Sequence, residues 1–298
     1  MLRIKKYAAI DIGSNAIRLL VSNVILEKNK EPQFKKSALV RVPIRLGADV
    51  FVNGKISKDN TARMIDALEA FKLLMKVHQV EKHHACATSA MREADNGKNV
   101  AAKILQKTGI KINIIGGKEE AKIISSTDLN ELIEKEASYL YVDVGGGSTE
   151  FTVFSNGKIV NSKSFKMGTV RLINNSKSEN KAIFKDVQIW IEKHTKDLKK
   201  ISLIGSGGNI NKLFKMSGRA IGKPISYIYL NAQYQFLKQM SYQERISELS
   251  LNPDRADVIV PATKIYLSAM KWSGARKIFV PKIGLADGII KNLYYSDL

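Results

Sequence analysis

Two short segments combine an aspartate, glycines and small polar residues at the end of an apolar run, which is a pattern typical of phosphate binding. The first segment is DIGSN, with Asp11, Gly13, Ser14 and Asn15. The second is DVGGGS, with Asp143, Gly145, Gly146, Gly147 and Ser148. Because glycine lacks a Cβ, the backbone can turn sharply and bring several N–H groups against one anion. The alternative interpretation is a tight hairpin that needs glycine only for its turn.

The aspartates suggest that a metal ion accompanies the phosphate. A carboxylate beside phosphate oxygens is unfavourable unless a hard cation lies between them. We therefore expect Asp143, and with it Asp11, to bind Mg²⁺ or Mn²⁺. Since the apolar strands around the two segments also match, we expect two like halves, each placing one turn at a shared cleft.

Three further segments carry candidate residues. In ATSAMREA, Thr88 and Ser89 can cap a helix and bind an anion, and Arg92 can bind phosphate oxygens in a bidentate manner. The alternative is an ordinary capped helix with a solvated arginine. In GGKEEA, Glu119 and Glu120 open a helix, where they diverge by about a hundred degrees, so only one can face a given site. That carboxylate can accept a proton from water, although acidic residues also simply favour first turns.

A third glycine turn, GSGGNINK, contains Gly207 and Gly208 and leads from a strand into a helix, which commonly seats a phosphate or nucleoside. Around these segments the chain alternates strands and helices. We expect a strand over residues 34–44, residues 45–47 in a loop, and a long helix capped by Ser57. Further helices are expected over 99–108, 121–135, 178–200, 231–249 and 254–272.

Composition limits the class of protein. A chain of 298 residues that is 44% hydrophobic is long enough for two domains, and it has no apolar run long enough for a transmembrane span or signal peptide. The single cysteine, Cys86, fits a reducing, cytoplasmic location. The net charge of +20 favours an anionic ligand, although lysine richness also follows coding bias. No nucleic-acid motif is recognised, so we expect no specific nucleic-acid partner and no membrane partner.

The motifs DIGSNAIRL, ATSAMREA, GGKEEA, VDVGGGSTEF, MGTVRL, GSGGNINKL and GLADGII, in this order and spacing, resemble the exopolyphosphatase / guanosine pentaphosphate phosphohydrolase (Ppx/GppA) family. The resemblance covers essentially the whole chain. It implies an α/β fold of two ribonuclease-H-like domains of the actin-like ATPase superfamily, flanking a central cleft. The expected domains are residues 1–125 and 126–298. The last helix of the second domain can pack back on the first domain.

The resemblance also implies roles for individual residues. Glu120 looks like the catalytic carboxylate, with Glu119 as its alternative, and Arg92 looks like a catalytic phosphate contact. Asp143 is implied as catalytic and, with Asp11, as a metal ligand. The residues implied in phosphate binding are Asp11, Gly13, Ser14, Asn15, Thr88, Ser89, Gly145, Gly146, Gly147, Ser148, Gly207 and Gly208, with Arg18 just behind the first motif and Gly205 in the third turn. Ala16 departs from the family pattern, which usually has a serine after Asn15.

The implied reaction is release of terminal phosphate from polyphosphate by metal-assisted attack of water. The same groups would serve a guanosine pentaphosphate phosphohydrolase. A kinase of the superfamily and a non-catalytic binder of nucleotide or polymer remain alternatives. The resemblance implies a short form of the family, whereas long members continue into extra helical domains that help them bind polymer and form dimers. Homodimer formation and processive action therefore stay open.

Overall fold

The structure is a computed structural model that describes residues 2–125, 127 and 137–296. The chain folds into two compact units. Unit 1 consists of residues 1–127 and 285–298, and unit 2 of residues 128–284. Residues 126 and 128–135 of the helix expected over 121–135 lie outside the described residues. Within the described ranges, no helix has the length and apolar character required to cross a bilayer.

Unit 1 contains a five-stranded mixed sheet in the order β3-β2-β1-β4-β5. Strand β2 runs antiparallel to β1 and β3, whereas β1, β4 and β5 are parallel. The strand bounds are β1 Arg3–Ile12, β2 Ile17–Leu26, β3 Gln33–Val42, β4 Lys82–Ala87 and β5 Ile112–Ile114. This order, with the second strand reversed, is the ribonuclease-H-like arrangement.

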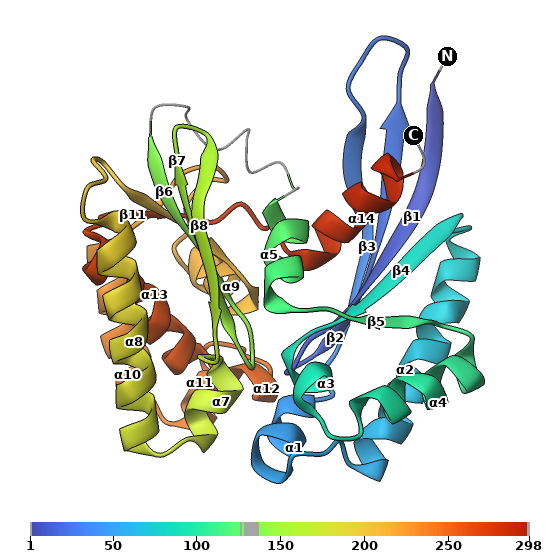
Figure 1. Cartoon of the computed structure of the whole chain (residues 1–298), viewed down its shortest axis with the longest axis horizontal. Coiled ribbons are helices and arrows are strands. Elements are labelled where there is room, and N and C mark those ends of the chain that lie inside the picture. Colours follow the sequence, from blue (N-terminus) through green and yellow to red (C-terminus); the bar gives the residue numbers. More distant parts are fainter. Residues whose placement is uncertain (1, 126, 128–136, 297–298) are drawn as a thin grey trace. The chain divides into compact units, whose positions relative to one another are not determined.

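Six described helices belong to unit 1. Their bounds are α1 Leu46–Asn53, α2 Lys58–Val77, α3 Ser89–Glu93, α4 Gly97–Thr108, α5 Gly117–Ser125 and α14 Leu285–Tyr295 (Figure 1). The expected cap of α2 is confirmed, since the Ser57 side chain accepts a hydrogen bond from the Asn60 N–H. The C-terminal helix α14 packs on β1, β2, β4 and α5, where the Cβ-less Gly288 lets it approach the backbone of Ile123.

The expected loop at residues 45–47 is wrong, because α1 begins at Leu46. Arg45, at its N-cap, has a φ of 62° and makes no side-chain capping bond. A left-handed residue without a capping side chain, followed by a glycine inside the helix, carries none of the usual start signals. Burial of Leu46 and Val50 in the core of unit 1 stabilises this helix instead.

Unit 2 repeats the same topology. Its sheet has the order β10-β11-β9-β6-β7-β8, in which β7 runs antiparallel to β6 and β8, and the additional edge strand β10 runs antiparallel to β11. Read from β8 to β11, the strands correspond one by one to β3 through β5 of unit 1. The bounds are β6 Ser138–Val144, β7 Thr149–Ser155, β8 Lys158–Phe165, β9 Ser202–Ser206, β10 Ile225–Ser226 and β11 Lys277–Phe279.

The described helices of unit 2 are α7 Thr169–Asn174, α8 Lys177–Thr195, α9 Gly208–Met216, α10 Tyr227–Gln239, α11 Tyr242–Ser247, α12 Pro253–Ala256 and α13 Ile259–Ser273. The single helix expected over 231–249 is wrong. Helix α10 ends at Gln239, with Met240 as its C-cap. A new helix, α11, begins after its N-cap Ser241, whose side chain forms a capping box with Glu244. The helix expected over 254–272 is likewise two helices, α12 and α13.

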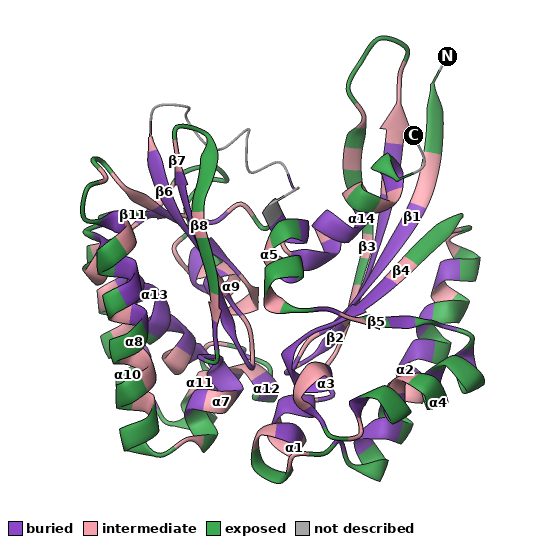
Figure 2. Cartoon of the chain, viewed as in Figure 1, coloured by how far each residue is buried: buried purple, intermediate pink, exposed green. Residues whose placement is uncertain are grey.

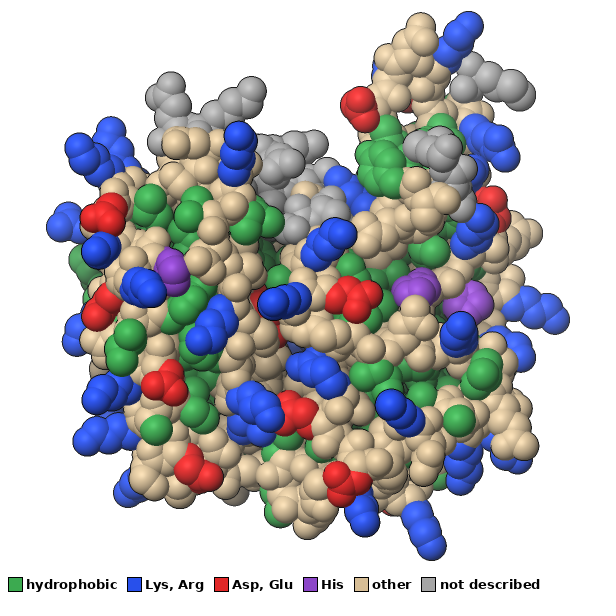
Figure 3. Space-filling model, viewed as in Figure 1, with side chains coloured by type: hydrophobic (Ala, Val, Ile, Leu, Met, Phe, Trp, Pro, Cys, Tyr) green, Lys and Arg blue, Asp and Glu red, His purple; other side chains and the backbone are tan. Residues whose placement is uncertain are grey.

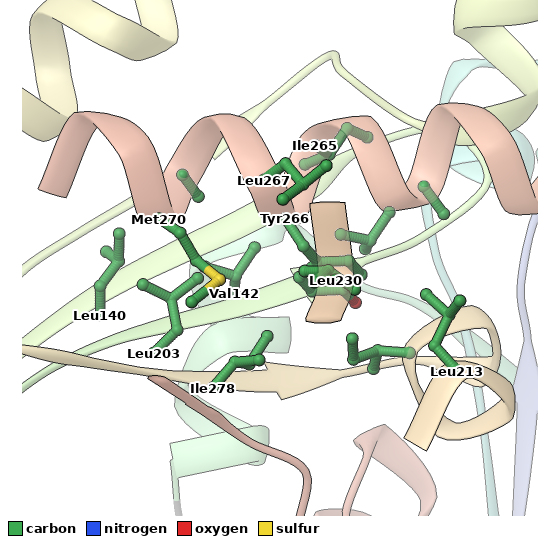
Figure 4. Packing of buried hydrophobic residues seen from close by; sticks show 14 of the residues in the cluster. Leu140, Val142, Leu203, Leu213, Leu230, Ile265, Tyr266, Leu267, Met270 and Ile278 are labelled. Carbon is green, nitrogen blue, oxygen red and sulfur yellow. The ribbon is translucent and has the colours of Figure 1, made fainter. Parts of the chain in front are cut away.

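Each unit has its own hydrophobic core, and buried residues follow the strands and the inner faces of the helices (Figure 2). In unit 2, Val142, Leu203 and Ile278 of the three parallel strands lie against Tyr266 and Met270 of α13 (Figure 4). The predicted fold class of two mixed α/β domains is confirmed by the two sheets. Each core fixes the carboxyl ends of its parallel strands, and these ends carry the candidate residues.

Candidate active site

The turn between β1 and β2 is held by the helix that follows β3. The N–H of Arg45 donates to the carbonyl of Asn15 at 3.0 Å, and the N–H of Gly47 donates to the carbonyl of Ser14 at 2.7 Å. A trans peptide places its C=O and N–H on opposite sides. Because these two carbonyls face α1, the N–H groups of Asn15 and Ala16 point the other way. The turn therefore presents backbone donors suited to an anion.

The turn between β6 and β7 is likewise held by the helix that follows the third strand of its hairpin sequence, through the carbonyl that corresponds to Ser14 and the one before it. The N–H of Thr169 donates to the carbonyl of Gly145 at 3.0 Å, and the N–H of Val170 donates to the carbonyl of Gly146 at 2.9 Å. Both donors belong to the first turn of α7. By the same peptide geometry, the N–H groups of Gly146 and Gly147 point away from α7. Helices α1 and α7 are thus equivalent supports, although sequence reasoning found no function for either of them.

Side chains of unit 1 gather at the carboxyl ends of β1 and β4. Asp11 is buried and forms an ion pair with Arg18, its direct partner on β2, at 2.9 Å. The hydroxyls of Ser14 and Ser89 are hydrogen-bonded at 3.0 Å. Thr88 holds the N-cap position of α3 without a side-chain capping bond, so the expected capping role is wrong. Ser89 instead ties α3 to the first glycine turn.

Arg92 and Glu120 extend this cluster. Arg92 Nη1 donates to the carbonyl of Ile115 at 2.7 Å, and Arg92 makes no other side-chain hydrogen bond within the part of the chain described. Its guanidinium keeps further donors for an anion. Glu120 is 8% exposed, whereas the neighbouring Glu119 is exposed, as adjacent positions on a helix require. Of the two candidates, Glu120 is therefore the one that the fold encloses.

The pKa of the Cys86 thiol is affected by the charges of this cluster. It lies beside Asp11 in the β1–β4 register and is fully buried. Burial, and after it the charges of Asp11, Glu119 and Glu120, raise the pKa of the Cys86 thiol to about 12. These three carboxylates therefore lie near enough to Cys86 for their charges to act on its thiol. The thiol stays protonated near neutral pH, which argues against a nucleophilic cysteine.

In unit 2, the residue directly opposite Asp143 is Glu150 on β7. Directly paired residues on antiparallel strands have side chains on the same face, so two carboxylates adjoin there. Glu150 is 2% exposed, and its Oε1 accepts hydrogen bonds from the hydroxyls of Ser148 at 2.7 Å and Ser164 at 2.8 Å. The sequence motif includes Glu150, but sequence reasoning assigned it no role. Glu150 follows Asp143 by seven residues across a tight hairpin, and this spacing could have predicted that the two residues are paired.

The third glycine turn adjoins Asp143 as well. Gly207 has a φ of 116°, and a Cβ built there would lie 2.9 Å from the Val144 carbonyl and 3.6 Å from Asp143 Oδ1. A side chain at this position would therefore be strained and crowded. Behind the turn, the hydroxyl of Tyr266 donates to the Ser206 carbonyl. Burial, and after it the Asp143 carboxylate, raise the pKa of Tyr266, which keeps this donor protonated.

The oxygen-rich set of Asp143, Glu150 and Ser148 fits a hard divalent cation, which typically uses one or two carboxylates and fills its remaining positions with phosphate and water. The described residues include no group of three or more His, Cys, Asp or Glu side chains that could hold a metal by themselves. The expected metal role of Asp11 remains a prediction, and the structure adds that Arg18 neutralises this carboxylate. The structure thus joins Ser14 to Ser89 in unit 1, and brings Gly207 close to Asp143 in unit 2, whereas the roles of the predicted residues remain predictions.

Comparison with known proteins identifies the family of the chain. The model of the Ppx/GppA phosphatase family matches residues 27–296. Exopolyphosphatase 2 of Mycobacterium tuberculosis is 26% identical over 97% of the chain and 98% of its own length. The bifunctional 3-dehydroquinate synthase/phosphatase of Fusobacterium nucleatum is 31% identical over 92% of the chain, which spans 44% of that relative.

A solved structure of an exopolyphosphatase from Cytophaga hutchinsonii matches with a TM-score of 0.86 and 23% identity, and the match covers 98% of each chain. At this identity the likeness establishes the fold. The predicted ribonuclease-H-like architecture and the predicted family resemblance are both confirmed.

Proposed function

Since the chain belongs to the Ppx/GppA phosphatase family, we propose that it is an exopolyphosphatase, which releases the terminal phosphate of inorganic polyphosphate by attack of water. The expected cytoplasmic location is part of this proposal. The observation that carries it is the match to an exopolyphosphatase over nearly the full length of both chains. Hydrolysis of guanosine pentaphosphate is the alternative, because the same terminal phosphoanhydride would be cleaved.

Unit 2 is proposed to bind the transferring phosphoryl group. The N–H groups of Gly146 and Gly147, oriented by the contacts of α7, would donate to phosphate oxygens. Asp143 and Glu150 would hold Mg²⁺ or Mn²⁺, which when bound offsets their charge and the charge of the phosphate. Ser148 and Ser164 keep Glu150 oriented, so that its carboxylate stays in place through turnover.

Unit 1 is proposed to supply proton transfer and charge stabilisation. Glu120 would accept a proton from the attacking water, and burial of its side chain limits the contact of the carboxylate with bulk solvent. Arg92, anchored to the Ile115 carbonyl through one nitrogen, would donate its other N–H groups to the oxygens that gain charge in the transition state. Asn15 and Ala16 would add backbone donors.

The test compares Glu120→Gln with Glu119→Gln, because the two residues are adjacent and chemically identical but only Glu120 is buried. We expect Glu120→Gln to lower kcat for polyphosphate by about 10²–10⁴, the usual worth of a general base. Glu119→Gln should stay within a few-fold of the unmodified enzyme. Phosphate release is measured with short polyphosphate, long polyphosphate, guanosine pentaphosphate and ATP, each with Mg²⁺ and with Mn²⁺.

Turnover of Glu120→Gln near the unmodified rate would remove Glu120 from the role of base. A kcat/KM for guanosine pentaphosphate well above that for both polyphosphates would replace the proposed substrate by the alternative. Tight polyphosphate binding without hydrolysis of any of the four compounds would identify a non-catalytic binder.

A further inference from the structure

A basic groove lies on unit 2, along α8 and beside α13. It has a volume of about 650 Å³ and is lined by Lys177, Asn180, Lys181, Phe184, Lys185, Gln188 and Lys264. We call these residues the α8 groove. Four of the seven are lysines, and none of the seven is acidic. The outward face of α8 is exposed, as Figure 2 shows, and Lys and Arg side chains are spread over the visible surface (Figure 3).

The spacing of the lysines concentrates positive charge. Lys177, Lys181 and Lys185 are four residues apart, so they stand on one helix face with a rise of about 6 Å between neighbours. Like charges at this spacing destabilise a helix, and cations in its first turn also oppose the helix dipole. Within the described ranges, none of the three lysines forms an ion pair. An anion lying along this face would relieve both disadvantages.

The aromatic residue of the groove argues against a nucleobase. Lys264 Nζ lies 4.7 Å from the centroid of the Phe184 ring, and Trp272 packs edge-to-face on that ring with centroids 6.0 Å apart. A base stacking on Phe184 from the groove would have to displace the Lys264 ammonium. The groove also has no arginine among its lining residues, and arginine is the residue that binds planar groups in a bidentate manner. Lysine ammonium groups, without an aromatic ring free for stacking, suit a flexible chain of phosphates better than a nucleobase.

The groove begins close to the glycine turn of the same unit. The first turn of α7 binds the carbonyls of Gly145 and Gly146, and α7 is six residues, or about 9 Å, long. Lys177, the first lysine of the groove, follows the C-cap of α7 by two residues. Only one short helix and two residues therefore separate the glycine turn from the first lysine of the groove.

We infer that the α8 groove binds the distal part of an inorganic polyphosphate chain and so selects long substrates. This inference rests on the proposed function, because it assumes that the chain end is held at the glycine turn. Each lysine would contact a different part of the chain without a fixed register. A short polyphosphate bound at the glycine turn would not extend to all of the lysines.

The test uses the full-length triple variant K177Q/K181Q/K185Q. The matched control is K98Q/K103Q/K107Q on α4 of unit 1, which removes the same charge from three exposed lysines. Binding of fluorescently labelled long-chain polyphosphate is measured by anisotropy over a series of salt concentrations, without divalent metal, so that hydrolysis is not needed. KM is then measured for long-chain polyphosphate and for tripolyphosphate. Thermal melting of both variants verifies folding.

We expect the groove variant to bind long polyphosphate roughly tenfold or more weakly. By analogy with single-stranded nucleic acids, the slope of log affinity against log salt should fall by about 2 for three lost phosphate contacts. KM should rise for the long chain and stay unchanged for tripolyphosphate. The control should remain within about twofold of the unmodified protein.

Equal losses in the two variants would show an effect of net charge alone and overturn the inference, as would unchanged binding by the groove variant. Unmodified protein that binds single-stranded RNA more tightly than polyphosphate, with that binding lost in the groove variant, would assign the groove to nucleic acid instead. If the expected binding losses appear but the unmodified enzyme releases no phosphate, only the proposed function fails.

Discussion

The two glycine turns share a backbone arrangement and differ in the charge beside the aspartate. In unit 1, Asp11 pairs across the hairpin with Arg18, and the two form an ion pair. In unit 2, Asp143 pairs across the hairpin with Glu150. The same position of the repeat thus carries opposite charges in the two units.

This difference indicates a division of labour. In unit 1 the protein itself supplies the cation for the aspartate. In unit 2, two carboxylates directly opposite one another repel, which is destabilising unless a cation lies near them. We therefore propose that the metal dependence of the reaction originates in unit 2, and that the turn of unit 1 binds phosphate mainly through its backbone N–H groups.

The sharpest test of this comparison removes one carboxylate from each turn. Glu150→Gln should lower kcat/KM by on the order of a hundredfold and raise the Mg²⁺ concentration needed for half-maximal activity, because one of two metal-facing carboxylates is lost. Asp11→Asn should change the Mg²⁺ requirement far less. The measurement is a Mg²⁺ titration of phosphate release for each variant. An equal shift in both variants would contradict the proposed division between the units.

A second test concerns the helices that support the turns. A Cβ on Gly168 would lie 2.2 Å from the Gly146 carbonyl oxygen, which is backbone. A Cβ on Gly47, which supports the turn of unit 1, would lie 2.7 Å from Phe51 Cε2, the end of a side chain that can rotate, and 3.2 Å from Ser14 Cβ. We expect Gly168→Ala to destabilise the protein by about 1–3 kcal/mol and to lower activity about tenfold, because α7 and its turn must separate.

The matched variant Gly47→Ala should cost less than Gly168→Ala in both stability and activity, since Phe51 can move aside. Urea denaturation gives the free energies of unfolding, and phosphate release gives the activities. A larger loss for Gly47→Ala would show that the turn of unit 1, rather than that of unit 2, depends more closely on its supporting helix.

Sequence reasoning could predict features that depend on local chemistry. The glycine turns, the Ser57 cap and the Gly109 end of α4 each follow from residues within a few positions of one another. It missed α1, whose first residues lack a capping side chain and which forms because Leu46 and Val50 are buried. It also joined α10 to α11, since the apolar period continues across the break at Ser241.

The candidate site divides in the same way. The motifs identified Asp11, Asp143 and Glu120 as candidate residues, and the 100° step along a helix predicted that Glu119 and Glu120 would differ in exposure. The role of Glu150 depends on strand register, which brings it opposite Asp143. Strand register depends on the length of the hairpin loop and on which face of each strand is buried. The sequence alone did not define these two features, so the pairing of Glu150 with Asp143 required the structure.

The smallest expected effect concerns the ion pair of unit 1. Arg18→Gln should reduce the free energy of unfolding by about 1 kcal/mol, because Arg18 is partly exposed and solvent screens the pair. If the pair itself is responsible, the double variant D11N/R18Q should be more stable than the sum of the single changes predicts, by a similar amount. Urea denaturation of the four proteins of this cycle provides the coupling energy. A coupling near zero would mean that Arg18 does not neutralise Asp11 in solution, and the charge contrast between the two turns would then disappear.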